Sequence, residues 1–189
     1  MPRVVDHHER RAEVAAIAAD LIAQRGLEGV SLRDVAARGG YSTTVVTHYF
    51  ANKHELLLHA YRSAGSATEA RLAAVAADAD DRLLAICEAI LPLDEARRRT
   101  WQTWFAFWGS AIADPELAGM QRRRLLWFRE MLADELTAAG ANDPHEAARE
   151  LLALVRGVAA EAIFDPDDWP AERQRDLVER TLDRLVVPA

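Results

Sequence analysis

Four short polar side chains stand close together in the first third of the chain: Thr43, Thr44, Thr47 and His48. At helical spacing they share the exposed face of one short helix, where hydroxyl and imidazole groups can reach base edges or phosphates of DNA. Ser31 and Ser42 stand where two helices are expected to begin, and the amino terminus of a helix favours a phosphate. These residue types and spacings indicate contact with nucleic acid.

Two short helices separated by a glycine turn would position these side chains. Ser31 can cap the first helix, the pair Gly39 and Gly40 can close it, and Ser42 can cap the second. The small residues for a close crossing and the apolar anchors beneath it are Ala36, Gly39, Leu32, Val35, Val46 and Phe50. This pattern predicts a helix-turn-helix whose second helix enters a major groove of double-stranded DNA.

The rest of the chain contains residues that typically start and end helices, and no long run of alternating apolar and polar residues predicts a strand. The first helix starts from a capping set at Asp6–Glu9 and ends at Gly26, and a fourth starts at Asn52 and ends near Ala77. The later helices are expected near Arg82–Leu91, Glu95–Ala113, Pro115–Ala139, Pro144–Phe164 and from Pro170 onward. The predicted fold class is all-α.

Charge is unevenly distributed along the 189 residues. The net charge is −7, yet residues 1–62 carry 8 Lys and Arg against 7 Asp and Glu, together with five of the six histidines. The remainder carries 15 Lys and Arg against 23 Asp and Glu. This asymmetry favours a first segment that meets a polyanion and a second segment with another task.

Composition places the chain among folded cytoplasmic proteins. Half of the residues are apolar and 28% are charged, which is typical of a globular domain. No apolar run approaches the ~18 residues of a membrane helix, and the first residues do not resemble a signal peptide. The single cysteine, Cys87, stands among leucines and isoleucines, which predicts a buried structural thiol in a reducing cytosol.

Three stretches of the chain resemble the DNA-binding half of TetR-family regulators: Val35–Ala36, Gly40–Ser42 and His48–Leu57. The resemblance spans Asp6 to about Tyr61 and implies a nine-helix fold. Residues 1–52 would form the helix-turn-helix domain, and residues 53–189 an effector-binding and dimerisation domain. It also implies that His48 and Tyr49 contact the DNA backbone and that Lys53 holds a phosphate. We include Arg33 among the candidate DNA contacts.

A subgroup of the family, the BetI-like choline-responsive repressors, is similar to further stretches of this chain: Ser42–Phe50, Trp101–Trp108, Asp114–Leu117 and Leu154–Gly157. The chain departs from the usual pattern at Gly39, where alanine is common, and at Tyr41, where a small aliphatic residue is usual. Thr47 often is tyrosine in the family, and glycine is usual in the subgroup at Thr44. These departures leave the operator sequence open.

The helix expected near Glu95–Ala113 carries a predicted aromatic stripe, formed by Trp101, Trp104, Phe105 and Trp108. The helix expected near Pro115–Ala139 adds Phe128 and Met131, with the charged Arg124 and Glu135 on the same face. Together, Trp101, Trp104, Phe105, Trp108, Arg124, Phe128 and Met131 form the candidate effector pocket. Core packing alone is the alternative explanation for the stripe.

The class of effector depends on the charge of this pocket. Indole faces can hold a cation, so the resemblance and the tryptophans favour a quaternary ammonium compound. If Arg124 points into the pocket, its charge favours an anion unless Glu135 neutralises it.

The last two helices carry the candidate dimer interface, on one face of each: Leu151, Leu154, Val158, Ala162, Leu177, Leu182 and Leu185. Gly157, Ala159 and Ala160 permit close approach of a second chain. Two such hairpins could pack as a four-helix interface, and the two-fold axis would require a palindromic operator. An ordinary intramolecular core is the alternative.

No catalytic or metal-binding pattern is present in the sequence. It contains no nucleophile elbow and no phosphate-binding glycine loop, and His7, His8, His54 and His59 lack the i, i+4 spacing of a helical zinc pair. We therefore expect no enzyme, no metal and no cofactor. The sequence predicts a homodimeric repressor that a small molecule releases from its operator, and a protein-interaction bundle without DNA is the competing class.

Overall fold

The computed structural model describes residues 7–76 and 81–186, and over these residues the chain forms nine α-helices and no strand. The helices of the first part are α1 (His7–Arg25), α2 (Leu32–Gly39), α3 (Thr43–Tyr49) and α4 (Lys53–Ala73). Those of the second part are α5 (Arg82–Ile90), α6 (Glu95–Ala111), α7 (Pro115–Ala138), α8 (Pro144–Phe164) and α9 (Ala171–Leu185). The predicted all-α fold is confirmed.

Local sequence signals start most of these helices. Ser31, Ser42 and Asn52 each accept a hydrogen bond from the backbone N–H three residues further on. The predicted fourth helix is longer than α4, because α4 ends at Ala73 and Ala74 caps it. The expected end at Ala77 and the expected cap at Asp6 lie outside the described residues.

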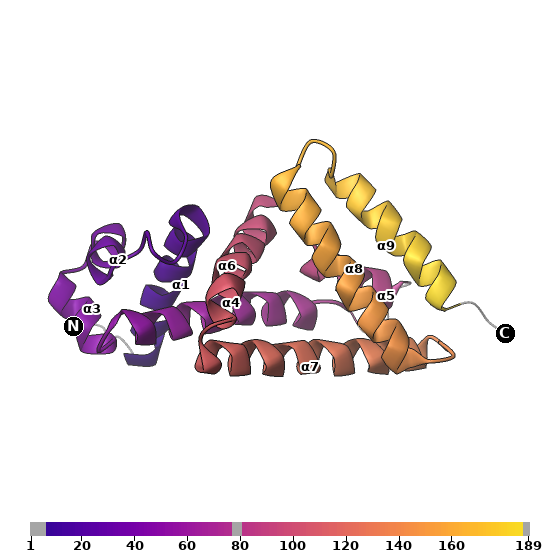
Figure 1. The fold of residues 1–189 in the computed structure, drawn as a ribbon, viewed down its shortest axis with the longest axis horizontal. Helices are drawn as coiled ribbons and strands as arrows, with labels where there is room; N and C mark the ends of the chain where they lie inside the picture. The colour runs from indigo at the N-terminus through magenta and orange to yellow at the C-terminus, as the bar shows by residue number, and fades with distance from the viewer. Residues whose placement is uncertain (1–6, 77–80, 187–189) are drawn as a thin grey trace.

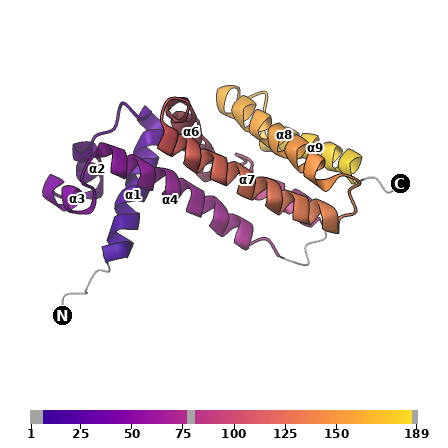
Figure 2. The same cartoon turned by 60° about the horizontal axis from the view of Figure 1, so that its bottom comes forward.

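The helices α1, α2 and α3 gather at one end of the molecule, and the antiparallel pair α8 and α9 lies at the other (Figure 1). Between these ends, α4 leaves the first group and runs alongside α7 (Figure 2). One hydrophobic core of buried side chains extends from the first helices to the last. No helix within residues 7–76 and 81–186 is long and apolar enough to cross a membrane.

A buried contact joins the first three helices, hereafter the head, to the rest of the chain. The hydroxyl of Thr103 on α6 donates a hydrogen bond of 3.0 Å to the carbonyl of Ala19 on α1, and Arg99 lies 3.5 Å from Asp20. These contacts, and α4, which follows α3 directly, join the head to the rest of the chain.

Candidate nucleic-acid interface and ligand cavity

The turn between α2 and α3 has the geometry that the sequence predicts. The Ser31 hydroxyl accepts from the Asp34 N–H, and the Asp34 carboxylate accepts from the Ser31 N–H, which completes a capping box. The hydrogen bonds from Ser31 lower the pKa of Asp34. Gly40 has a φ of 69°, the left-handed conformation that a side chain would disfavour.

The helix α3 buries one face and exposes the other. Val46 and Phe50 are fully buried and hold the helix against the head. The candidate base contacts on the opposite side are all exposed: Thr43, Thr44, Thr47 and His48. The Thr47 hydroxyl donates to the Thr44 carbonyl at 3.1 Å, so this side chain has a fixed orientation toward its own helix. Ser31, Arg33 and Ser42 are also exposed.

A ring cluster at the end of α3 includes His7, a histidine whose type allows either a solvated or a phosphate-facing role. His7, the first residue of α1, lies 4.6 Å from Tyr49 and 5.7 Å from His48 between ring centroids. His48 and Tyr49 themselves are 5.3 Å apart. The two predicted backbone contacts thus lie against the first residue of α1, which a local sequence pattern does not reveal.

The unusual Gly39 and Tyr41 form one structural unit. A Cβ atom built on Gly39 would lie 2.6 Å from two ring carbons of Tyr41 and 2.9 Å from Ile17. Arg10 donates to the Tyr41 oxygen at 2.7 Å, and the Tyr41 hydroxyl donates to Glu13 at 2.6 Å. This bond to Glu13 raises the pKa of Tyr41. The tyrosine thus occupies the space that an alanine side chain would need.

Lys53 is the first residue of α4 and is partly exposed beside the head. Its neighbour His54 contacts the amino terminus of α7, with Nε2 3.1 Å from Glu116 and Nδ1 3.8 Å from Asp114. These contacts connect the start of α4 with the helix that carries Arg124. No local pattern predicts that His54 joins α4 to α7, because its partners lie about sixty residues away along the chain.

Five of the seven candidate pocket residues come together around one small space: Trp101, Trp104, Trp108, Arg124 and Phe128. That space has a volume of about 10 Å³, which is no more than one water molecule needs. Phe105 packs at its edge, 5.4 Å from Trp101 and 5.0 Å from Trp108, and Met131 is half-buried against the core. The predicted pocket is thus a filled aromatic cluster in this structure.

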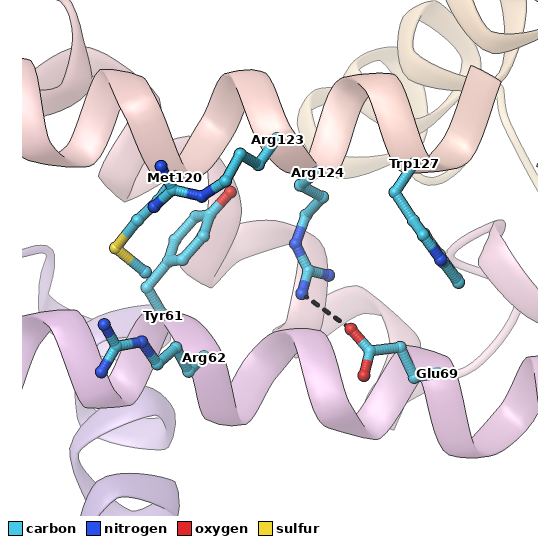
Figure 3. Close-up of a pocket in the computed structure, with 7 residues that line it drawn as sticks. All are labelled: Tyr61, Arg62, Glu69, Met120, Arg123, Arg124 and Trp127. Carbon is cyan, nitrogen blue, oxygen red and sulfur yellow. Dashed lines mark hydrogen bonds and ion pairs between the residues drawn. The ribbon is translucent and has the colours of Figure 1, made fainter. Parts of the chain in front are cut away.

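A larger cavity of about 520 Å³ lies beside the cluster, between α4 and α7 (Figure 3). Its lining comes from both helices and consists of Tyr61, Arg62, Glu69, Met120, Arg123, Arg124 and Trp127. Of these, only Arg124 was a sequence-predicted pocket residue. The others are spread over two helices that are far apart in sequence, and no spacing rule brings them together.

Arg124 belongs to both spaces. Its Nη2 lies 3.2 Å from Glu69 on α4, and only 13% of its side chain is exposed. The guanidinium rests on Gly65, where an added Cβ would come within 1.5 Å of Nη2. Arg124 therefore reaches α4 only because position 65 has no side chain.

Glu135 does not neutralise Arg124. It accepts from Arg82 Nε at 2.9 and 3.0 Å, at the start of α5. The two charges that share a predicted face of α7 thus have different partners: Arg124 pairs with Glu69 on α4, and Glu135 pairs with Arg82.

Comparison with known proteins identifies the fold and the class of function. The model of bacterial regulatory proteins of the tetR family matches residues 15–60, and that of the BetI-type transcriptional repressor C-terminal domain matches residues 79–187. The chain belongs to the TetR family of transcriptional regulators. Within the family, the HTH-type transcriptional regulator BetI of Burkholderia lata is 34% identical over 165 residues, which cover 84% of each chain.

Solved structures agree with this TetR-family assignment. A transcriptional regulator from Rhodococcus sp. RHA1 has a TM-score of 0.86 at 34% identity, over 94% of this chain and 99% of that one. A regulator from Saccharomonospora viridis in complex with choline has a TM-score of 0.82 at 23% identity, over 96% and 100% of the two chains, and shows the shared fold. The matched families and relatives are transcriptional regulators and not enzymes, as the sequence predicts.

The candidate dimer residues of this TetR-family chain divide into two groups. Leu151, Val158, Ala162 and Leu182 are buried within the protomer itself, and so is Ala159, which we expected to face a second chain. Leu154, Leu177 and Leu185 are only partly buried. The more exposed face of α8 instead presents Ala153, Gly157, Ala160 and Phe164, and Phe164 is 84% exposed. The sequence pattern did not separate the inner side of these two helices from their outer side.

The histidines and acids of the described ranges form no group of three or more that could hold a metal ion. Cys87 is fully buried, and this burial raises the pKa of its thiol to about 12. The predicted buried structural thiol is confirmed.

Proposed function

We propose that this TetR-family regulator is a repressor that binds a palindromic operator as a homodimer and is released from it by a small-molecule effector. The observation that carries the proposal is the cavity between α4 and α7, because α4 begins in the head and α7 contacts that beginning through His54. Residues 1–52 serve as the DNA-binding part and residues 53–189 as the sensing and dimerising part.

The contacts between α4 and α7 give the cavity a route to the head. A ligand that changes the distance between the two helices also displaces α7 against His54, next to Lys53. In a dimer such a displacement alters the separation of the two α3 helices, which must match two half-sites about one helical turn apart. Effector and operator then weaken each other's binding by the same factor.

DNA recognition is assigned to α3 and the start of α4. Thr43 and Thr44 contact base edges, and His48, Tyr49 and Lys53 contact the sugar-phosphate backbone. The exposure of the α3 face and the position of Lys53 at the first turn of α4 support this division.

Dimerisation is assigned to α8 and α9. Gly157 and Ala160 are small and accessible, so a second copy of α8 can approach closely there, and the exposed Phe164 ring adds apolar area at the end of the helix. Leu177 and Leu185 border this surface from α9. Leu177 and Leu185, the partly exposed interface residues on α9, are thus continuous with the accessible small residues of α8.

The first experiment selects bound sequences from a random duplex pool and then measures affinity for the selected duplex over a range of salt concentrations. Lys53→Ala should weaken binding to all duplexes and reduce the salt slope by about 1 per protomer. Thr43→Ala and Thr44→Ala should instead change the preferred bases. The exposed Arg180 on α9 provides a matched control, because Arg180→Ala removes one cation far from α3.

The competing function, a protein-interaction bundle, predicts no salt-dependent binding to any duplex in the pool. That result would overturn the proposal. The effector classes that the sequence leaves open are a quaternary ammonium compound and an organic anion.

A further inference from the structure

The aromatic cluster between α6 and α7 already contains cations of its own. The Arg124 guanidinium carbon lies 5.5 Å from the Trp104 ring centroid and 5.6 Å from that of Tyr61. From α8, the Arg156 guanidinium lies 5.3 Å from the Trp108 ring. These are the distances at which an aromatic face holds a cation. A quaternary ammonium ligand would have to displace both guanidiniums to use the same faces.

Positive charge exceeds negative charge around the cluster. Among the described residues, Arg124 has one ionic partner, Glu69 at the rim of the cavity, and half of the Glu69 side chain is exposed. For Arg156, no hydrogen bond or ion pair occurs within residues 7–76 and 81–186. Burial, with a contribution from the neighbouring Arg129, lowers the pKa of Arg156. A cation that is partly removed from water without a counter-charge is costly, and Glu135, the acid on the same predicted face of α7, is engaged with Arg82.

Three buried hydrogen-bond donors in this region have no acceptor among the described residues: Trp104 Nε1, Arg124 Nη1 and Arg129 Nε. Each buried group without a partner costs about 1–3 kcal/mol. All three are donors, so one acceptor-rich group could satisfy several of them, whereas a second cation could satisfy none.

The adjoining cavity supplies room for the body of a ligand. Arg124 separates the cavity of about 520 Å³ from the aromatic cluster and lines both. Tyr61, Met120 and Trp127 offer apolar surface to the same cavity, as Figure 3 shows. A volume of this size is typical of small-molecule sites. A planar guanidinium binds a carboxylate through two parallel hydrogen bonds.

We infer that the effector of this chain is a small organic carboxylate with an apolar body, held through its carboxylate by Arg124, which lines the cavity, and by Arg156, which lines the small space of the aromatic cluster. The space that the two arginines share has a volume of about 10 Å³, so side chains of the cluster must move apart as the carboxylate enters. This inference rests on the proposed function, since it names the ligand class of the same sensing site. The carboxylate takes up the unpartnered donors, and the apolar body lies between α4 and α7. A bound carboxylate competes with Glu69 for Arg124 and so changes the ion pair that joins α7 to α4 at this cavity.

Three probes of similar shape and different charge test the ligand class: phenylacetate, phenylacetamide and benzyltrimethylammonium. Octanoate adds an aliphatic carboxylate, and phenyl phosphate adds the other common anion. Binding to the full chain is measured by titration calorimetry and by tryptophan fluorescence, because Trp104 and Trp127 lie at the site. We expect one or both carboxylates to bind and the amide and the ammonium to be silent. Binding of the ammonium alone, of phenyl phosphate alone, or of none of the probes at millimolar concentration would overturn the inference.

Substitutions of the two arginines test the site itself. Arg124→Gln and Arg156→Gln should each weaken carboxylate binding by about tenfold or more, because each removes hydrogen bonds to a charged group. Arg180→Gln on the exposed face of α9 is the matched control and should change nothing. Unchanged affinity in both arginine variants would contradict the assignment.

A second variant keeps the test valid if an arginine variant fails to fold. Gly65→Ala retains every charge but places a Cβ on the seat of the Arg124 guanidinium, so it should weaken carboxylate binding. Gly109→Ala on α6 is the control, because an added Cβ there meets nothing within 4 Å. Equal affinities in the two glycine variants would show that Arg124 does not hold the ligand.

Operator binding distinguishes failure of this inference from failure of the proposed function. A chain that binds its selected duplex but no carboxylate is a TetR-family repressor with another effector, and the inference is wrong. A chain that binds carboxylate but no duplex supports the ligand class and refutes the repressor. Release of the duplex by the bound carboxylate supports both.

Discussion

The fit of Gly39 against Tyr41 makes a quantitative prediction about the head. Gly39→Ala places a Cβ at 2.6 Å from the tyrosine ring and 2.9 Å from Ile17, both far inside van der Waals contact. The ring cannot turn away freely, because Arg10 and Glu13 both bind its hydroxyl. Overpacking of this kind costs about 1–3 kcal/mol.

A gain in helix propensity partly offsets this cost. Alanine is favoured over glycine by up to about 1 kcal/mol in a helix interior, and Gly39 is the last residue of α2. We therefore expect Gly39→Ala to lower the free energy of unfolding by about 1–2 kcal/mol, a factor of about 5–30 in the ratio of folded to unfolded chain.

The double variant with Tyr41→Val separates the steric clash from other effects of the alanine. Once the ring is gone, Gly39→Ala should be neutral or stabilising, so the coupling energy of the cycle should reach at least about 1 kcal/mol. Urea unfolding followed by far-UV circular dichroism is the assay, at one fixed protomer concentration because dimerisation shifts apparent stability. The same loss with and without Tyr41 would refute the reasoning.

Three further predictions concern single residues. Cys87 has a pKa of about 12, so at about pH 8 roughly one molecule in ten thousand should hold it as the thiolate. Iodoacetamide should therefore label Cys87 only at the rate of unfolding, and fast labelling of the native chain would contradict its burial. Burial lowers the pKa of His59, so the unfolded chain binds the proton more readily and stability should fall as the pH drops below about 6.5. In His59→Gln the urea midpoint should fall less on acidification than in the unaltered chain. An identical fall in both chains would argue against a contribution of His59. His54→Ala removes the exposed contacts to Glu116 and Asp114. The variant should reduce the effect of the effector, measured as operator affinity without effector divided by operator affinity with it, by about two- to fivefold. A change in operator affinity alone would mean that His54 contacts DNA.

Helix boundaries and the turn of the head were predictable because the interactions that decide them are local in sequence. Ser31 and Ser42 cap helices through N–H groups three residues away, and Gly40 permits a conformation that no neighbour needs to enforce. The family resemblance rests on this same segment. The sequence also located the aromatic cluster on α6, since its members recur at helical spacing.

The charge and volume of the ligand site were decided only by tertiary structure. Sequence spacing placed Arg124 and Glu135 on one face of α7, but packing gave them partners on α4 and α5, far away along the chain. Gly65 determines where Arg124 can rest, and Arg156 arrives from α8. Such contacts depend on how whole helices pack against one another, which no local pattern records. The sequence by itself therefore determined the helices and the exposed face of α3, and the packing of α4, α7 and α8 determined a cavity beside Arg124 and the aromatic cluster that also contains Arg156.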